Sequence, residues 1–370
     1  MKIAVLCPYD FSIPGGVQTQ ALNLASSLKN SGHKVVLFAP LSSENQHQIK
    51  NVEFIDIGRP VKFNFLGSNS RISLNLIKII KISNFINKNN FDVIHLHEPL
   101  SPTFLLLIAL VKKTKIIGTF HAYSHKRHFW YYYFNFFLRR FIKKIDQKIC
   151  VSETSKKYIS KYFDENFFII PNGIELQKYR NLAKKTNEFS EQSKKILFVG
   201  RFEEKRKGFN ILLEAFKNLS LEFNKVQLNV VGPGDPKKIK YKNKNIDFSK
   251  INFIGSVNQS DLPNYYNDAD IVCLPSLENE SFGVIILESM ASGKILVLSD
   301  IESYKNVALK NNYGFLYDYK SSNKLAELLL SILKNEKSSE RNIKNGLKNV
   351  KNYSWDYLVS EIIKIYKKSN

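Results

Sequence analysis

The sequence predicts an α/β protein that folds as two Rossmann-like domains, each with a parallel sheet between helices. Short apolar runs alternate with segments of helical periodicity, which is the pattern of repeated βαβ units. The alternation stops at a polar stretch and then starts again, and 370 residues exceed one ordinary hydrophobic core. We therefore expect one domain at residues 1–180, to which a C-terminal helix at 353–370 returns, and a second at 181–352.

The composition is that of a folded protein with a strong positive charge. The 55 Lys and Arg residues against 33 Asp and Glu give a formal net charge of +22. This charge suggests an anionic partner such as nucleic acid, anionic lipid or a phosphorylated substrate. Lys, Asn, Ile and Phe are abundant throughout the chain, so part of the charge reflects a general compositional bias.

The cysteines and the short apolar runs favour a cytosolic protein. Cys7, Cys150 and Cys273 fall at or in predicted strands, so buried thiols in a reducing compartment are favoured over disulfides or a metal site. The N-terminal apolar run stops at Pro8, too short for a signal peptide, and the run at 104–111 is far too short to span a membrane. A position on a membrane surface is compatible with both features.

The first domain opens with a strand, a glycine turn and a helix. Residues 2–7 are the expected strand, Pro14-Gly15-Gly16 is the turn, and Gly32 follows the helix. A glycine turn at a helix N-terminus is a ready anion site, although the same residues suit a plain tight turn. The pattern is not G-x-G-x-x-G, so a nicotinamide cofactor loses its main support.

Histidines lie at the ends of the next two strands. His95 and His97 share one face of a strand at 91–97, with no further metal ligands nearby, so buried and hydrogen-bonded side chains are favoured. His121 directly follows a strand at 115–120. Its position fits a structural and a functional role equally.

Residues 123–148 combine aromatic and basic side chains. This mixture suits a membrane interface, and the alternative is a helix packed on the core with a basic outer face. Residues 71–88 are expected to form a second amphipathic, basic helix, which is more typical of a plain surface helix. The aromatic and basic residues of the first segment are Tyr123, Lys126, Arg127, Phe129, Trp130, Tyr131, Tyr132, Tyr133, Phe134, Phe136, Phe137, Arg139, Arg140, Phe141, Lys143 and Lys144.

The second domain repeats the strand–turn–helix pattern after a polar linker at 180–194. Arg201 and Lys207 flank the turn after its first strand, where two cations can neutralise a diphosphate. Lys205 and Arg206 are expected to be solvated surface charges. Further strands are expected at 226–231, 251–257, 270–276 and 295–298, and later helices at 323–334 and 339–350.

Two glutamates flank the start of a helix in this domain. Glu280 lies in the loop after the strand at 270–276, and Glu288 lies in the following helix, which Gly293 is placed to end. Ligands of open parallel sheets bind at the carboxyl ends of strands. The loop therefore offers a carboxylate to sugar hydroxyls and backbone N–H groups to phosphate oxygens, whereas solvated surface carboxylates are the alternative.

The spacing of Glu280 and Glu288 resembles the E-x7-E signature of retaining glycosyltransferases of family 4, which have the GT-B fold with two Rossmann-like domains facing a central cleft. Stretches across nearly the whole chain look closer still to the actinobacterial phosphatidyl-myo-inositol α-mannosyltransferases, which add the first mannose. These stretches are Cys7-Pro8-Tyr9, Pro14-Gly15-Gly16-Val17-Gln18, Gly67-Ser68 with Arg71, His95-Leu96-His97-Glu98-Pro99, Thr119-Phe120-His121, Ile170-Pro171-Asn172-Gly173, Arg206-Lys207-Gly208 and Glu280-Ser281-Phe282-Gly283.

The resemblance implies transfer of mannose, with retention, from GDP-mannose to the inositol of phosphatidylinositol at the inner membrane face. The protein would then be cytoplasmic and peripheral on an anionic phospholipid membrane, with residues 123–148 facing it. The resemblance implies no metal and no tightly bound cofactor, because Arg201 and Lys207 supply the electrostatic stabilisation that a metal gives elsewhere.

The resemblance also implies roles for individual residues. The catalytic group is His121, Arg201, Lys207 and Glu280. The donor is contacted at its diphosphate by Gly15, Gly16, Arg201 and Lys207, at its sugar by Glu280, Ser281, Phe282, Gly283 and Val284, at its ribose by Glu288, and also by Val257. The inositol phosphate of the acceptor is contacted by Tyr9, Gln18, Ser68, Arg71 and Lys126.

Two positions depart from this family pattern. Gln259 stands where the family has an acidic residue that reads guanine, and Leu262 replaces a basic neighbour. A transferase that uses UDP-glucose or UDP-N-acetylglucosamine, such as a glucosyl-diacylglycerol synthase, is therefore the alternative. A sugar-nucleotide epimerase is disfavoured by the E-x7-E spacing. A nucleic-acid-binding protein is disfavoured because the glycine turns and paired acids would have no role.

Overall fold

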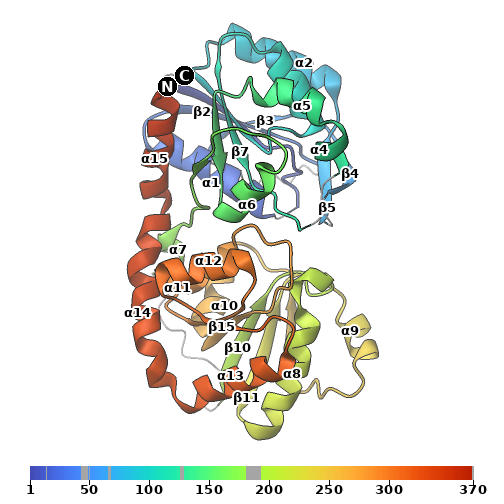
Figure 1. Cartoon of the computed structure of the whole chain (residues 1–370), viewed down its shortest axis with the longest axis vertical. Helices are drawn as coiled ribbons and strands as arrows, with labels where there is room; N and C mark the ends of the chain where they lie inside the picture. Colours follow the sequence, from blue (N-terminus) through green and yellow to red (C-terminus); the bar gives the residue numbers. More distant parts are fainter. Residues whose placement is uncertain are drawn as a thin grey trace. The chain divides into compact units, whose positions relative to one another are not determined.

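The computed structural model describes residues 1–13, 15–42, 49, 51–65, 68–125, 129–180 and 193–368. The chain divides into two compact units, Met1–Gly173 with Trp355–Asn370 (unit 1) and Ile174–Ser354 (unit 2), as Figure 1 shows. Each unit is an α/β domain with its own parallel sheet. The linker predicted at 180–194 lies largely outside the described residues, so the domain boundaries placed there stay a prediction.

The sheet of unit 1 has seven parallel strands in the order β3-β2-β1-β6-β7-β8-β9. Its central strands are buried along nearly their whole length, because helices cover both faces of the sheet. The strands are β1 (Lys2–Leu6), β2 (Lys34–Ala39), β3 (Glu53–Asp56), β6 (Val93–His97), β7 (Lys115–Phe120), β8 (Gln147–Cys150) and β9 (Phe168–Ile169).

Two hydrophobic layers flank this sheet. One layer packs against α2, α3 and α5, and the other against α1 and α15. The last helix, α15, lies beside α1 (Figure 1). The helices of unit 1 are α1 (Gly16–Asn30), α2 (Leu76–Lys88), α3 (Pro102–Leu110), α4 (Phe129–Tyr133), α5 (Asn135–Ile142), α6 (Glu153–Ile159) and α15 (Trp355–Lys367).

The segment 71–88 contains part of a strand before its helix. Arg71 belongs to β5 (Ser68–Ser73), which pairs antiparallel with β4 (Pro60–Phe65). Helix α2 begins only at Leu76, because the Asn75 side chain accepts from the Lys78 N–H and caps the helix. The expectation of a helix from Arg71 onward is therefore wrong, since Arg71 pairs with Lys62 in the local β4–β5 hairpin.

The aromatic and basic segment folds as α4 and α5 with two different sides. Tyr131, Leu138 and Ile142 are buried, so one side belongs to the core. Phe136, on the other side, is 92% exposed. We define the exposed residues Phe129, Tyr132, Tyr133, Phe134, Phe136, Phe137, Arg139, Arg140, Lys143 and Lys144 as the aromatic-basic surface. Every helix in the described part of the chain is too short or too polar to cross a membrane.

The sheet of unit 2 has six parallel strands in the order β12-β11-β10-β13-β14-β15. The order of strands reverses between β10 and β13, and ligands of doubly wound sheets bind at this switch point. The strands are β10 (Lys194–Val199), β11 (Val226–Val231), β12 (Ile251–Gly255), β13 (Ile271–Leu274), β14 (Ile295–Ser299) and β15 (Phe315–Tyr317).

The helices of unit 2 cover both faces of its sheet, and each face has its own hydrophobic layer. The helices predicted before Gly293, at 323–334 and at 339–350 are present as α11, α13 and α14. The full set is α7 (Leu176–Arg180), α8 (Phe209–Glu222), α9 (Pro236–Lys242), α10 (Leu262–Asp268), α11 (Val284–Ala291), α12 (Glu302–Asn311), α13 (Ser322–Lys334) and α14 (Glu340–Asn349), with 3₁₀ turns at Lys205–Lys207, Glu336–Ser339 and Val350–Tyr353.

Candidate active site

Two loops meet at the switch point of the unit 2 sheet. One follows β10 and contains residues 200–208, and the other follows β13 and contains residues 275–283. The Leu277 N–H of the second loop donates to the Arg206 carbonyl oxygen of the first at 2.7 Å. Gly208 has a φ of +65°, and a Cβ there would lie 1.8 Å from a backbone oxygen of the other loop. Only glycine permits this close approach.

Glu280, in the second loop, is held by two cations. Its Oε1 accepts from Lys207 Nζ at 2.6 Å and from Arg206 Nη1 at 2.8 Å. Burial alone would raise the pKa of Glu280, but the charges of Lys207 and Arg206 outweigh burial and lower the pKa below its usual value. Glu280 is therefore an ionised carboxylate in a fixed position at the carboxyl edge of the sheet.

Arg206 is not the solvated charge that the sequence suggested. Its side chain is only 22% exposed and pairs with both Glu280 and Glu204. The 3₁₀ turn at Lys205–Lys207 directs Arg206 toward the second loop and leaves Lys205 exposed. Arg201 Nη1 donates to Glu204 Oε1 at 3.2 Å, so Arg201 joins the same chain of charges.

Glu288 lies on α11, where tyrosines hold its carboxylate. Tyr266 donates its hydroxyl to Glu288 Oε2 at 2.5 Å, and Tyr179 is a second hydrogen-bond partner. Burial raises the pKa of Glu288, and these two hydrogen bonds limit the rise. The residue as a whole is half-buried.

The other residues predicted to contact the donor in unit 2 lie near the same edge. Gly283 precedes α11 with a φ of +88°, and a Cβ there would lie 2.6 Å from the Tyr304 ring, so the turn requires glycine. Phe282 is buried in the core. The half-buried residues of this group are Val257, Ser281 and Val284.

The glycine turn of unit 1 lies at the N-terminus of α1, as the sequence predicts. Gly15 is the residue before the helix and Gly16 is the first helical residue. The first turn contains no acidic side chain, and a Cβ on Gly16 would meet nothing within 4 Å among the described residues. The positive end of the helix dipole is therefore open to an anion.

Three of the five predicted acceptor residues gather around Asp10, which the sequence analysis missed. Arg71 Nη1 lies 3.9 Å from Asp10 Oδ2, and Gln18 Nε2 donates to the Asp10 carbonyl oxygen at 3.2 Å. Tyr9 is its chain neighbour. Asp10 is 1% exposed and stands just after the first strand, at the carboxyl edge of the sheet. The sequence could have indicated Asp10, because it follows a predicted strand and ligand-binding residues lie at that end of a parallel strand.

The remaining two predicted acceptor residues are not both placed. Ser68 begins β5, and its side chain is not described. Lys126 lies outside the described residues. Arg71 keeps 39% of its side chain exposed beside Asp10, so its guanidinium is accessible to a ligand.

His121, at the end of β7, is held on two sides. Its Nε2 lies 2.9 Å from His97 Nδ1, and the two rings stack with centroids 5.1 Å apart. Its backbone N–H donates to Glu98 Oε1 at 2.8 Å. Glu98 has a φ of +54°, a conformation that non-glycine residues rarely adopt. The last residue of β6, His97, therefore fixes the ring of His121, and the next residue, Glu98, fixes its backbone.

The histidine group, which we define as His95, His97 and His121, is buried and neutral. Burial lowers the pKa of His95 and His121 to about 3 and that of His97 well below its usual value. Burial also raises the pKa of Glu98 to about 7. The expectation of buried, hydrogen-bonded His95 and His97 is confirmed. In the described part of the chain, no three His, Cys, Asp or Glu side chains are arranged to hold a metal ion.

The sequence analysis missed His97 and Glu98 as partners of His121. The signal was available, because β6 and β7 are neighbouring parallel strands in which His97 pairs with Thr119. The residues that follow such a pair must meet at the same edge of the sheet.

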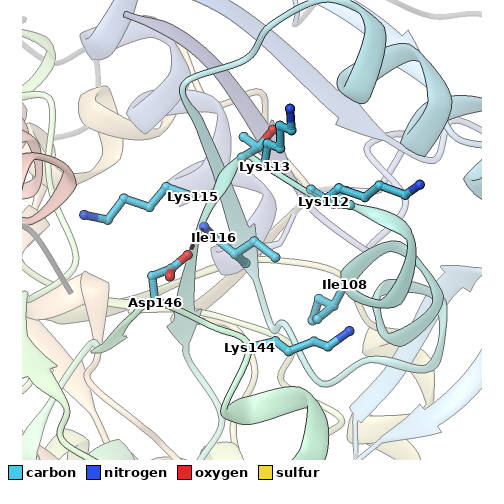
Figure 2. Close-up of a pocket in the computed structure, with 9 residues that line it drawn as sticks. Ile108, Lys112, Lys113, Lys115, Ile116, Lys144 and Asp146 are labelled. Carbon is cyan, nitrogen blue, oxygen red and sulfur yellow. Dashed lines mark hydrogen bonds between the residues drawn. The ribbon is translucent and has the colours of Figure 1, made fainter.

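A larger pocket lies elsewhere in unit 1, at the start of β7. It has a volume of about 480 Å³ and contains Lys112, Lys113, Lys115 and Lys144. Figure 2 shows Lys115 extending to one side and Lys112 and Lys144 to the other, so the ammonium groups do not converge on a single anion. The pocket lies at the amino end of the strand, opposite to His121, and it contains none of the predicted site residues.

Comparison with known proteins identifies the family. The model "Glycosyl transferases group 1" matches residues 180–349, and "Glycosyltransferase Family 4" matches residues 14–178. The phosphatidyl-myo-inositol mannosyltransferase of Mycobacterium tuberculosis is 31% identical over 99% of this chain and 96% of its own length. The protein of the same name from Mycobacterium leprae is 30% identical over 99% and 96%.

The fold has close structural neighbours. A crystal structure of HepE from Anabaena in complex with UDP and glucose superposes with a TM-score of 0.79, at 15% identity, over 99% of both chains. The predicted family, α/β fold class and enzyme class are thus confirmed. The chain belongs to the group 1, family 4 glycosyltransferases with the GT-B fold of two Rossmann-like domains.

Proposed function

We propose that this glycosyltransferase transfers mannose, with retention, from GDP-mannose to the inositol of phosphatidylinositol at the inner face of the membrane. The observation that carries the proposal is the 31% identity, over nearly the full length of both chains, to a protein named phosphatidyl-myo-inositol mannosyltransferase. The reaction breaks the bond between the sugar and the diphosphate and leaves its electron pair on a phosphate oxygen. Catalysis therefore needs cations beside the leaving group.

The charged cluster of unit 2 supports this donor chemistry. Arg201 and Lys207 would hold the diphosphate as negative charge develops on it. Glu280 would accept hydrogen bonds from the mannose hydroxyls, and Glu288 would accept from the ribose. The open N-terminus of α1, at Gly15 and Gly16, would provide N–H donors to a phosphate group.

The group around Asp10 supports an anionic acceptor. The exposed part of Arg71 would pair with the phosphate of phosphatidylinositol, together with Lys126. Tyr9 and Gln18 would bond the inositol hydroxyls. His121, in the same unit, would lie beside the reacting hydroxyl of the acceptor.

The aromatic-basic surface supports docking of unit 1 on a membrane. Its rings favour the interface between lipid and water, and its cations favour an anionic leaflet. The exposed fractions of Phe136 and Tyr133, at 92% and 68%, would be reduced by burial in the headgroup layer. The protein would then be peripheral on the cytoplasmic side.

A UDP-sugar is the second candidate for the donor. Gln259 is exposed just after β12, and Leu262 begins α10, where the family has charged residues. An amide can bond guanine or uracil, because it both donates and accepts. The catalytic residues would keep their roles with either nucleotide.

Calorimetric titration with GDP, UDP and ADP tests the donor first. Selective binding of GDP, followed by mannosylation of phosphatidylinositol vesicles with GDP-mannose, is the expected result. Selective binding of UDP would instead indicate a glucosyl- or N-acetylglucosaminyltransferase. Binding of none of the three would contradict the proposed donor class.

Vesicle flotation tests the membrane surface. A variant with Arg139, Arg140, Lys143 and Lys144 changed to Gln should lose about 10²–10³-fold in affinity for anionic vesicles, since each basic residue contributes about 1 kcal/mol there. The matched control changes the four exposed lysines of α9, Lys237, Lys238, Lys240 and Lys242, and should bind normally. Equal loss in both variants would mean that net charge alone drives binding.

A further inference from the structure

A small cavity in unit 1 adjoins the histidine group. Its volume is about 20 Å³, and its lining includes His97, His121, Gln20 and Trp355. A water molecule needs roughly 10–15 Å³ of such space and two to four polar partners. The cavity is therefore large enough for one water.

Two buried polar atoms of the lining residues have no hydrogen-bond partner among the described residues. They are His97 Nε2 and Trp355 Nε1. Gln20 does not supply the partner, because its amide already bonds the Gly173 backbone at 2.8 and 2.9 Å. Buried polar groups are rarely left unpaired, so a bridging molecule is expected at this point.

The direction of the bond between His97 and His121 follows from counting protons. Both rings are neutral, so one proton lies between His97 Nδ1 and His121 Nε2. The indole N–H of Trp355 can only donate. A water that accepts from Trp355 can donate to His97 Nε2, and His97 then carries its own proton on Nδ1. In the opposite tautomer the Trp355 and His97 rings would both donate to this water, and neither of them would accept from it.

We propose that His97 is a positioning residue for His121: it donates from Nδ1 to His121 Nε2, and a water bound between His97 and Trp355 sets this direction. His121 then carries its proton on Nδ1 and presents one fixed N–H donor. The use of that donor on a substrate oxygen rests on the proposed function, whereas the tautomers do not. Trp355, the first residue of α15, thereby becomes part of the site.

Nitrogen-15 NMR of the side chains tests the tautomers directly. The chain has seven histidines and two tryptophans, so the signals can be assigned with His97→Asn, His121→Asn and Trp355→Phe. We expect a protonated Nδ1 and a bare Nε2 in both His97 and His121. Trp355→Phe should give mixed tautomers in both rings. A protonated Nε2 in His121, or no change in Trp355→Phe, would overturn the proposal.

Kinetics of two His97 variants separate positioning from packing. Asparagine keeps an N–H donor near the place of Nδ1, and leucine keeps only bulk. We expect kcat to fall about tenfold or more in His97→Leu, with the donor KM within about twofold, because one buried hydrogen bond is lost. His97→Asn should stay within about threefold of the wild type. Equal losses in both variants would indicate a merely structural role and refute positioning.

Tyr366→Phe is the matched control on the same helix. Tyr366 OH lies 2.6 Å from His95 Nδ1, so its loss disturbs a neighbouring histidine but not the bond from His97 to His121. The His121 signals should stay unchanged, and a shift as large as in Trp355→Phe would contradict the water-mediated route. If the wild type transfers no mannose, the proposed function fails while the NMR result still decides the tautomers.

Discussion

The cluster around Glu280 in unit 2 is charged, whereas the cluster around His121 in unit 1 is neutral. Both lie at the carboxyl edge of a parallel sheet, where the first is half-buried and the second is buried. Glu280 has Lys207 and Arg206 within 2.8 Å, and these cations keep it ionised despite burial. The His121 ring bonds a second imidazole, that of His97, and burial keeps it uncharged.

The difference teaches which kind of ligand each cluster can accommodate. A cation can exchange one anionic partner for another when a charged ligand binds. Lys207 can therefore exchange its contact with Glu280 for one with a phosphate. Hydrogen bonds between neutral rings are directional and leave the proton at a fixed atom. The charged cluster of unit 2 thus suits a ligand that gains negative charge during the reaction. The neutral cluster of unit 1 suits a ligand that is bound in one orientation by a directional hydrogen bond.

Removal of the Glu280 carboxylate should give the largest effect. Glu280→Ala is expected to lose turnover by about 10²–10³-fold, because it removes the group that we propose bonds the reacting sugar. Affinity for GDP, measured by calorimetry, should not fall, since Lys207 and Arg206 are released for the diphosphate. Glu280→Gln is the control of equal shape. Weaker GDP binding in both variants would show that Glu280 organises the cations instead of competing for them.

Glu98→Gln should change the pH dependence of stability. The pKa of Glu98 is raised from 4.5 to about 7, so the folded state keeps its proton where the unfolded state has lost it. The contribution of Glu98 to the free energy of unfolding of the wild type therefore declines as the pH rises from 4.5 to about 7 and is constant above that pH. The free energy of unfolding of Glu98→Gln relative to wild type should rise by up to roughly 3 kcal/mol across that window. Urea unfolding at several pH values measures this difference. A difference that does not change with pH would mean that Glu98 has an ordinary pKa in the folded state.

Arg206→Met should give a smaller loss, of about tenfold in turnover. Glu280 would keep Lys207 but lose the second donor that fixes its position, and one charge-assisted hydrogen bond contributes about this much. Lys205→Met is the matched control, because it removes the same charge from the neighbouring exposed residue. Initial rates with the donor and the lipid compare the two variants. An equal loss in both would mean that the change in net charge, and not the contact with Glu280, lowers the turnover.

Elements with local signals could be predicted from the sequence, and contacts between distant residues could not. The loop before α11 was predictable, because Gly283 and an apolar helix period lie within a few residues of Glu280. The pairing of Arg206 with Glu280 spans 74 residues and depends on two loops meeting, so the sequence suggested only a charged run. Arg71 was wrongly assigned to the helix that follows it, although it pairs with Lys62 in the local β4–β5 hairpin. The contact of His97 with His121 was within reach of sequence reasoning, because parallel neighbours end together.

The placement of α15 has a consequence for how the protein is made. The chain leaves unit 1 at Gly173 and rejoins it at Trp355, and the Trp355 ring packs so closely on Gly173 that a Cβ there would lie 2.5 Å from it. A ribosome therefore synthesises all of unit 2 before it delivers the helix that completes the core of unit 1. Until then the apolar face beneath α15 is uncovered in the nascent chain, and the histidines lack Trp355 and Tyr366. The enzyme acquires its oriented His121 only after the last helix has been translated, so a chain stopped before Trp355 should be both inactive and a target for chaperones.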